Sequence, residues 1–381
     1  WEFEVSKISI IYHHFPHYRV PVMMELLLSK NHEYDFYGDI NDFEGIKAFK
    51  GDDLIKINPI SFEKNFLGKL DIFEYEEAVS NKYDATIIIG HINMLGTWRA
   101  LNLAKKNGLA TAYWAHGWLK KESFLKSKIR NFYFNQADIT LTYGARATKI
   151  ASSSGFNSDK IYTIWNSLDW NKQTSLFNKF KNIDRLSLRS SINMPLDKPI
   201  LLTISRVTSI CYYDWLIKAA HKLRANGGPQ VEIWMIGDGA ELDNLKNLAQ
   251  DLSVPLHVKG AIYDEHIIAK QIMAADLVVS PGKVGLTAMH ALAYGTPVIT
   301  HGNFDLQMPE VEALEVGKSG DFFEYGNIDD LALKIDKFLK KNSDYSLIRQ
   351  FCRSSLEGRF TPNDQVRLID KAMDRILNVK K

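Results

Sequence analysis

The sequence predicts an α/β protein built from two doubly wound domains, each with a parallel β-sheet covered by helices. Three observations carry this prediction. Short β-branched or aromatic runs alternate with longer amphipathic segments along the whole chain, and this rhythm is typical of parallel sheets with helices on both faces. The chain has 381 residues, more than one core usually holds. Its hydrophobic content of 45% and charged content of 24% are those of an ordinary globular protein.

Four short runs in the first half are predicted to be strands, because they are rich in β-branched or aromatic residues. They cover residues 7–14, 34–39, 85–91 and 110–117. Residues 20–31 and 96–108 carry apolar side chains at helical spacing, and each segment ends in Asn or Gly, which commonly stop helices.

The second half repeats this order. Its predicted strands cover residues 198–207, 230–239, 255–262, 275–282 and 297–302, with helices between them. A polar stretch at residues 171–185, which we expect to lack regular structure, separates the halves. The domains are therefore placed at residues 1–170 and 171–360. Residues 361–381 predict a strongly amphipathic helix, whose pattern alone allows packing on either domain.

Composition and missing motifs exclude several classes of function. The net charge of +2 gives no reason to expect a nucleic-acid partner. Cys211 and Cys352 lie far apart, so we expect neither a disulfide framework nor a zinc site, and we expect a cytoplasmic setting. No P-loop, G-x-S-x-G elbow or H-E-x-x-H motif occurs, and no strand-end Asp-x-Asp pair predicts a metal site. No run approaches the roughly 18 apolar residues of a membrane span.

Three loops in the second half follow predicted strands, where ligands bind in open α/β sheets. Arg206 follows the first strand, a Gly-Asp-Gly turn at residues 237–239 follows the second, and a glycine loop at residues 282–285 follows another. The glycine loop opens a predicted helix at residues 286–294, whose dipole and free N–H groups would favour a phosphate. One glycine loop alone is explained equally well by a structural turn. All three in fixed order indicate a phosphate-binding edge.

The segment at residues 13–19 lies between the first predicted strand and the first predicted helix. Its three histidines, arginine and aromatic rings could bind a hydroxyl-rich acceptor. A capped loop without a ligand explains His13 and His14 equally well. His116 follows another strand, and this position favours a functional role over that of a buried structural histidine.

Basic and aromatic residues are interleaved at residues 118–134. A helix of this composition can lie on an anionic membrane surface. A solvated basic face with an apolar core stripe is the commoner explanation of such a pattern.

Several segments together resemble the retaining GT-B glycosyltransferases of family four, which use sugar nucleotides. The clearest lie between residues 200 and 320, and they read ISRV, MIGDGAELDNLKNLAQDL, VKGAI, MAADLVVSPG, GLTAMHALAYGTPVIT and MPEVEALEVGKSGDFF. In the first half, FPHYRVPVMMEL, AHG and NSLD fit as well. The resemblance implies two Rossmann-like domains facing a cleft, with the acceptor on the N-terminal domain and the nucleotide sugar on the C-terminal domain. It also implies that the last helix crosses back to the N-terminal domain and that transfer is metal-independent, with retention.

The resemblance also implies roles for single residues. Arg206 matches the family's arginine on the donor phosphates, His116 a histidine near the transferred sugar, and Glu310 the glutamate of its Pro-Glu pair. The expected donor-binding residues are Gly237, Asp238, Gly260, Ala261, Ile262, Gly282, Val284, Gly285, Leu286, His290 and Glu310. The expected acceptor-binding residues are His14, Phe15, His17, Tyr18 and Arg19.

Three positions depart from the family pattern. Cys211 stands where the family usually has a lysine, and Gly282 and His290 stand where it usually has two glutamates. Stabilising the charge on the leaving diphosphate is usually the largest catalytic effect, so a lost lysine matters. We hypothesise that Lys283 supplies the missing cation and acts in catalysis with His116 and Arg206, and that His290 replaces the ribose-binding carboxylate.

The sequence therefore predicts a hexosyl- or deoxyhexosyltransferase of bacterial surface polysaccharide or glycolipid synthesis, in the cytoplasm or at the inner face of the membrane. Its partners would be a nucleotide diphosphate sugar, as co-substrate, and a glycan or lipid-linked acceptor, with no resident cofactor or metal. Two alternatives stay open. One is a GT-B epimerase or phosphorylase, and the other is a catalytically degenerate protein that binds sugar nucleotides.

Overall fold

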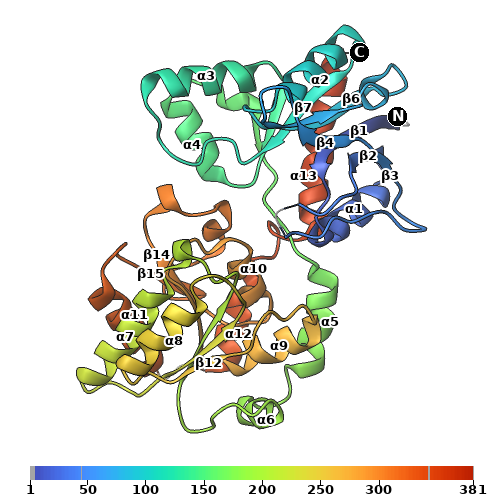
Figure 1. Ribbon diagram of the computed structural model, residues 1–381. Helices are drawn as coiled ribbons and strands as arrows, with labels where there is room; N and C mark the ends of the chain where they lie inside the picture. Colours follow the sequence, from blue (N-terminus) through green and yellow to red (C-terminus); the bar gives the residue numbers. More distant parts are fainter. Residues whose placement is uncertain (1–4, 44, 342–343, 381) are drawn as a thin grey trace. The chain divides into compact units, whose positions relative to one another are not determined.

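The computed structural model describes residues 5–43, 45–341 and 344–380. The chain divides into two compact units (Figure 1). Unit 1 comprises Trp1–Asp169 with Gly358–Lys381, and unit 2 comprises Trp170–Glu357. Each unit is a parallel sheet covered by helices, so the predicted α/β class is confirmed.

Unit 1 contains a seven-stranded sheet in the order β3-β2-β1-β6-β7-β8-β9, and its neighbouring strands are parallel. The strands are β1 (Ser6–His14), β2 (His32–Asp39), β3 (Ile57–Pro59), β6 (Ala85–Ile89), β7 (Ala110–Ala115), β8 (Ile139–Thr142) and β9 (Ile161–Thr163). From β1 the chain adds β2 and β3 towards one edge of the sheet, and from β6 it adds β7, β8 and β9 towards the other. The switch in strand order therefore falls between β1 and β6.

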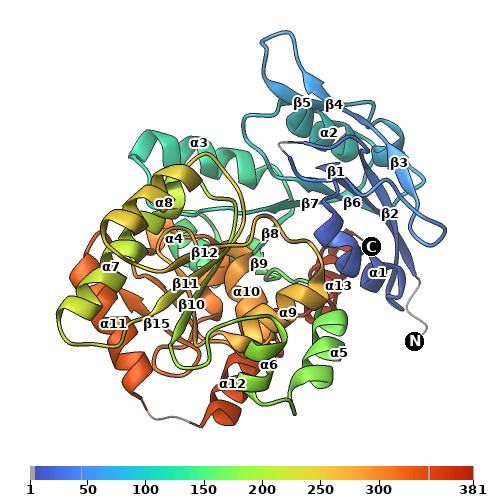
Figure 2. The same cartoon turned by 60° about the horizontal axis from the view of Figure 1, so that its bottom comes forward.

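Helices cover both faces of this sheet (Figure 1 and Figure 2). On one face lie α1 (Val20–Leu27) and α13 (Pro362–Lys380), and on the other lie α2 (Leu95–Lys106), α3 (Phe124–Asn135) and α4 (Ala145–Ser153). Short 3₁₀ helices, η1 (His17–Arg19), η2 (Glu77–Val79) and η3 (Ser158–Lys160), lie in the connections. Consecutive strand residues serve opposite faces, since buried Ile10 joins the first core and buried Ile11 the second.

Helix α13 packs on unit 1 although unit 2 precedes it in the chain. The Tyr34 hydroxyl donates to Asp370 Oδ1 at 2.6 Å. Ser167 Oγ donates to Gln365 Oε1 at 2.7 Å, and Gln365 Nε2 donates to the Trp165 carbonyl at 2.8 Å. These bonds fix the position of the last helix along the sheet.

An antiparallel hairpin of β4 (Ser61–Lys64) and β5 (Leu70–Phe73) was not predicted from the sequence. Asp71 Oδ1 accepts a hydrogen bond from Gly96 N at 2.6 Å, which ties the hairpin to the start of α2. A Cβ at Gly96 would lie 2.2 Å from the Ile72 carbonyl oxygen, so this close approach requires glycine. The hairpin is thus anchored on unit 1.

Unit 2 contains a six-stranded sheet in the order β12-β11-β10-β13-β14-β15, with parallel neighbours. The strands are β10 (Ile200–Ile204), β11 (Glu232–Ile236), β12 (Leu256–Val258), β13 (Leu277–Ser280), β14 (Val298–His301) and β15 (Gly320–Phe323). The helices are α5 (Trp170–Phe180), α6 (Arg185–Ser191), α7 (Tyr213–Ala225), α8 (Leu242–Asp251), α9 (Glu265–Ala274), α10 (Gly285–Ala293), α11 (Ile328–Lys340) and α12 (Tyr345–Ser354), with the 3₁₀ turns η4 (Ser209–Cys211), η5 (Phe304–Leu306) and η6 (Pro309–Ala313). No helix in the described ranges is both long and apolar enough to cross a membrane.

The prediction that residues 171–185 lack regular structure was wrong, because they are largely helix α5. The Arg353 guanidinium lies 4.3 Å from the ring centres of both Trp170 and Phe177. It also donates to Thr174 Oγ1 at 2.9 Å. These contacts with a distant helix stabilise a segment whose own composition is polar, so local pattern could not reveal it.

Candidate functional site

The carboxyl edge of the unit 2 sheet brings together the three loops selected from the sequence. Strands β10, β11 and β13 lie beside one another, so the loops that follow them leave the same edge. Gly237 N donates to the Gly260 carbonyl at 2.8 Å, and Val207 N donates to the Asp238 carbonyl at 2.9 Å. The switch in strand order lies between β10 and β13, where open α/β sheets bind ligands.

The Gly-Asp-Gly turn is shaped by close backbone packing. A Cβ at Gly237, whose φ is +149°, would lie 1.9 Å from the Ser205 carbonyl oxygen. A Cβ at Gly239 would lie 2.1 Å from the Val207 carbonyl oxygen. Asp238 is exposed, and its Oδ1 accepts from Gly239 N at 2.7 Å. Both glycines are therefore required by the fold of this edge, whatever they bind.

The glycine loop before α10 is held by Gln307, which the sequence did not suggest. Gln307 is 4% exposed. Its Oε1 accepts from Val284 N at 2.9 Å, and its Nε2 donates to Thr300 Oγ1 at 2.8 Å. Lys283 is exposed, and no carboxylate among the described residues forms an ion pair with it. The buried Gln307 side chain thus fixes the loop, and the Lys283 side chain is exposed to solvent.

Cys211 and Gly282, two positions that depart from the pattern the sequence resembles, are in contact in the structure. A Cβ at Gly282 would lie 2.1 Å from the Ile210 carbonyl oxygen and 2.8 Å from Cys211 Cα. Cys211 Sγ donates to the Arg206 carbonyl at 3.1 Å. The turn η4 therefore packs directly on Gly282, and a glutamate at position 282 would displace it. Cys211 and Gly282 therefore belong to one packed turn.

The third departure, His290, is paired with a carboxylate from another helix. His290 Nε2 lies 2.8 Å from Glu265 Oε1, which also accepts from the Tyr294 hydroxyl at 2.6 Å. Burial alone would raise the pKa of Glu265, but the hydrogen bonds and charge of His290, with Tyr294, lower it overall. Glu265 is the first residue of α9, next to the helix-capping Asp264. A sequence pattern would not connect it to His290, because they are 25 residues apart.

The other expected donor residues differ in exposure. Glu310 lies in η6 and is 2% exposed. Leu286 is half-buried in the first turn of α10, and residues 260–262 form the loop after β12. Arg206 is exposed after β10. Arg206 and Ala261 are therefore the exposed members of this group, and Gly260, Ile262 and Leu286 are half-buried.

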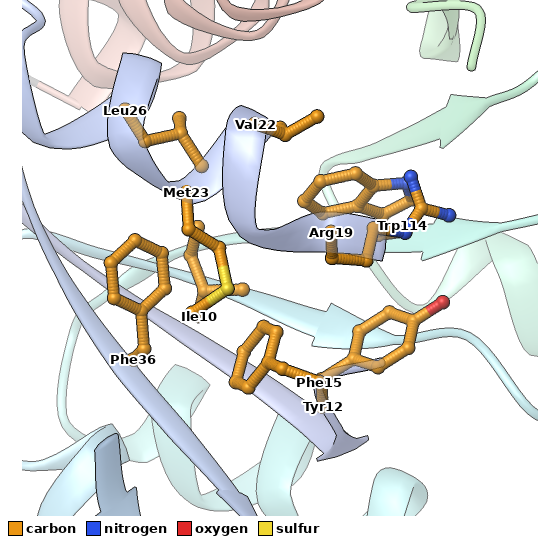
Figure 3. A pocket seen from close by; sticks show the side chains of 9 residues that line it. All are labelled: Ile10, Tyr12, Phe15, Arg19, Val22, Met23, Leu26, Phe36 and Trp114. Atoms are coloured by element: carbon orange, nitrogen blue, oxygen red, sulfur yellow. The ribbon is translucent and has the colours of Figure 1, made fainter. Parts of the chain in front are cut away.

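Arg19, an expected acceptor residue, is buried in unit 1. Its guanidinium donates to Asn166 Oδ1 at 2.8 Å and to the Tyr143 hydroxyl at 2.5 Å. It lies 5.4 Å from the ring centre of Trp114, and Figure 3 shows these two side chains beside each other. The ring of His116, also an expected site residue, lies 4.9 Å from that of Tyr143. Arg19 thus anchors the end of the sheet and positions the surroundings of His116.

The pocket beside Arg19 in Figure 3 is too small for a sugar. It has a volume of about 10 Å³ and is lined mainly by apolar side chains, including Ile10, Met23 and Phe36. This volume corresponds to about one water molecule. This pocket therefore cannot hold a sugar.

The remaining expected acceptor residues are divided between core and surface. His14 and Phe15 are buried, at 2% and 4% exposure. Tyr18 is half-buried and His17 is exposed, and His116, which was expected to be catalytic, is also exposed. Only the last three of these can contact a ligand without rearrangement.

The fold is that of the GT-B glycosyltransferases. A glycosyltransferase of Rickettsia africae has a TM-score of 0.72 and 17% identity, with 98% of this chain and 99% of that chain covered. HepE of Anabaena, solved with UDP and glucose, has a TM-score of 0.68 and 15% identity, with 97% and 99% covered.

Sequence comparison points to the same class of protein. Residues 184–353 match the family model described as glycosyl transferases group 1. A lipopolysaccharide core biosynthesis glycosyltransferase, LpsE of Rhizobium meliloti, is 26% identical over 199 residues. That match covers 51% of this chain and spans 56% of the length of the relative.

Proposed function

We propose that this protein is a retaining glycosyltransferase that moves a hexosyl or deoxyhexosyl group from a nucleoside diphosphate sugar to an acceptor hydroxyl. The observation that carries the proposal is the carboxyl edge of unit 2, where the loops after β10, β11 and β13 meet the start of α10. The family match covers this edge. The name of LpsE supports a role in the synthesis of lipopolysaccharide or another surface polysaccharide.

The donor binds at this edge in our proposal. The first turn of α10 offers backbone N–H groups and a positive dipole end to a diphosphate. Arg206 and Lys283 are exposed at the same edge and supply two positive charges. The solved complex of HepE contains UDP and glucose, so uridine diphosphate sugars are the first donors to test.

The reaction needs charge stabilisation more than it needs a nucleophile. The acceptor oxygen attacks the anomeric carbon from the face that the diphosphate leaves, the carbon–oxygen bond to the diphosphate breaks, and the acceptor proton passes to a phosphate oxygen. Arg206, Lys283 and the start of α10 would stabilise the negative charge that develops on the diphosphate. This scheme requires no divalent metal and gives retention of configuration.

The test is release of nucleoside diphosphate from a panel of sugar nucleotides, with and without a fraction of glycolipids as acceptors. We expect release to depend on the acceptor, and the product to keep the anomeric configuration of the donor by NMR. Lys283→Ala should lower turnover by about 100-fold, the usual effect of removing one such donor group. Release without an acceptor, or unchanged turnover in this variant, would contradict the scheme.

One alternative is favoured by a specific observation. Turn η4, which includes Cys211, packs on Gly282. At these two positions the family that the sequence resembles usually has a lysine and a glutamate. A degenerate protein that binds sugar nucleotides without transferring the sugar would keep the diphosphate edge and lose these groups. Tight donor binding together with no turnover on any acceptor would identify this alternative.

We also propose that unit 1 contacts the inner face of the membrane through helix α3 and the segment before it, at residues 118–134. Phe124 is 78% exposed, Leu125 69% and Phe132 62%, so these apolar side chains are not a core stripe. Lys120, Lys121, Lys126 and Lys128 accompany them. Exposed apolar side chains next to lysines match the interface of an anionic bilayer.

Sedimentation with lipid vesicles tests this contact. We expect binding to vesicles that contain phosphatidylglycerol, weaker binding to pure phosphatidylcholine, and loss of binding in Phe124→Ser/Leu125→Ser. Leu333→Ser is the matched control, because Leu333 is exposed on α11 of unit 2. Equal binding of the double variant and the wild type would rule out this surface.

A further inference from the structure

A groove of about 610 Å³ opens at the carboxyl edge of the unit 1 sheet. His13 at the end of β1, His91 after β6, Phe62 of β4 and Phe43 line it. Of these four, only His13 belongs to the segment at residues 13–19 that the sequence suggested for an acceptor, and Phe43, Phe62 and His91 were not expected. The groove lies beside the switch in strand order between β1 and β6, which is the ligand-binding position of such a sheet.

Aromatic rings form one wall of the groove. The ring centres of Phe43 and Phe62 are 5.1 Å apart, and those of His13 and Phe62 are also 5.1 Å apart. The ring centre of His14, which does not line the groove, lies 5.9 Å from that of Phe43. One face of a pyranose ring exposes mainly C–H groups, so it can stack on such a wall without losing hydrogen bonds to water.

The histidines of this wall are neutral near pH 7. Burial, followed by the nearby His14, lowers the pKa of His13 to about 3. Burial also lowers the pKa of His14. A neutral imidazole has one donor and one acceptor nitrogen, which suits a hydroxyl group. His13 Nδ1 is buried and has no hydrogen-bond partner among the described residues.

The rim carries one positive charge on a fixed hairpin. Lys69 lines the groove and is exposed, and no carboxylate among the described residues forms an ion pair with it. Phe62 N donates to Asp39 Oδ2 at 2.8 Å, which ties the hairpin to the end of β2. Asn65 N donates to the Lys69 carbonyl at 2.8 Å and closes the hairpin turn. The backbone that carries Lys69 is therefore fixed beside the rings, and its exposed side chain can reach a ligand in the groove.

We propose that this groove binds a sugar ring that carries a phosphate or carboxylate group, as part of the acceptor. The ring stacks on Phe43 and Phe62, its hydroxyls bind His13 and His91, and its negative group binds Lys69. The inference rests on the proposed glycosyltransferase function and adds to it the chemical class of the acceptor.

Titration calorimetry with simple probes tests the proposal on the full chain. The probes are glucose, glucose 6-phosphate, glucuronate and inorganic phosphate, so phosphate and carboxylate are separated. We expect at least one charged sugar to bind more tightly than glucose and than inorganic phosphate. Phe62→Leu should weaken glucose and the charged sugar by about 3- to 10-fold, the usual worth of aromatic packing. Lys69→Gln should weaken only the charged sugar, by about tenfold.

Lys64→Gln is the control, since Lys64 is exposed on the same hairpin and does not line the groove. The proposal is overturned if both groove variants bind the sugars like the wild type. It is also overturned if inorganic phosphate binds as tightly as the charged sugars. UDP titrated into the same samples separates the two claims. If UDP, GDP, dTDP or ADP binds and neither groove variant changes sugar binding, the groove alone is refuted. If the wild type binds none of these four nucleotides, the donor site is refuted.

Discussion

At the scale of single residues, the three positions that depart from the pattern the sequence resembles are each packed against or paired with a neighbour. Cys211 and Gly282 belong to one packed turn, and His290 is paired with Glu265. A carboxylate is therefore present beside position 290, although it comes from α9 instead of α10.

The first prediction concerns Gly282. Gly282→Ala places a Cβ 2.1 Å from the Ile210 carbonyl oxygen, so we expect the free energy of unfolding to fall by about 1–3 kcal/mol. Gly302→Ala is the matched control, because its Cβ would lie 3.5 Å from Phe322 Cβ, an ordinary contact. Denaturant unfolding measures both. Equal midpoints for the two variants would show that η4 does not pack on Gly282.

The second prediction concerns the pH dependence of Glu265. Its pKa is lowered in the folded protein, so its contribution to stability is present above its ordinary value of 4.5 and is lost as the pH falls through the folded value. Glu265→Gln should therefore lower the free energy of unfolding at pH 7 by about 1–3 kcal/mol. The difference from the wild type should shrink below pH 4.5.

Glu315→Gln is the control for that measurement, because Glu315 forms an exposed ion pair with Lys318. Such pairs contribute about 0–1 kcal/mol. If the free energies of unfolding of Glu265→Gln and the wild type differ by the same amount at every pH, the ionised Glu265 carboxylate is not what stabilises the fold.

At the scale of elements, one carboxylate joins four segments of unit 2. Asp276, just before β13, accepts from Arg185 and Arg189 of α6, from Ile200 N of β10 and from the Tyr345 hydroxyl of α12. Arg189 and Asp276 are only 3% and 6% exposed. This cluster holds α6 and α12 against the sheet that carries the donor edge.

The third prediction follows from this cluster. Asp276→Asn leaves the buried Arg189 without its ion-pair partner, so we expect the free energy of unfolding to fall by about 3–5 kcal/mol. Asp329→Asn breaks an exposed pair with Lys222 and should cost about 0–1 kcal/mol. Thermal unfolding by calorimetry compares the two. A cost for Asp276→Asn no larger than that for Asp329→Asn would exclude the cluster as an anchor.

At the scale of the whole molecule, periodicity was enough to predict the fold class. Strands such as β1 and β11 are buried and β-branched or aromatic, so local pattern identifies them. Helix α5 and the β4–β5 hairpin were not predicted, because their partners lie in distant parts of the chain. Arg353 of α12 contacts α5, and Gly96 N of α2 donates to Asp71 of the hairpin. Segments held by tertiary contacts leave no local signal.

The candidate site shows the same limit. The loops after β10, β11 and β13 were found from glycine and strand-end patterns. Gln307 and Glu265 were not, because they reach the edge from segments 23 and 25 residues away. Arg19 was placed at the acceptor surface from its strand-end position, but it lies 7% exposed in the core. Sequence position indicates the edge of a sheet, but it does not indicate whether a side chain turns inward.

The fourth prediction is the most direct test of the central claim, that the unit 2 edge binds a nucleoside diphosphate. Titration calorimetry with UDP, GDP, dTDP and ADP should find at least one that binds to the wild type. Arg206→Ala and Lys283→Gln should each weaken that binding by about tenfold, since each removes a charged partner of the diphosphate. Binding of none of the four, or equal binding by both variants and the wild type, would contradict the account.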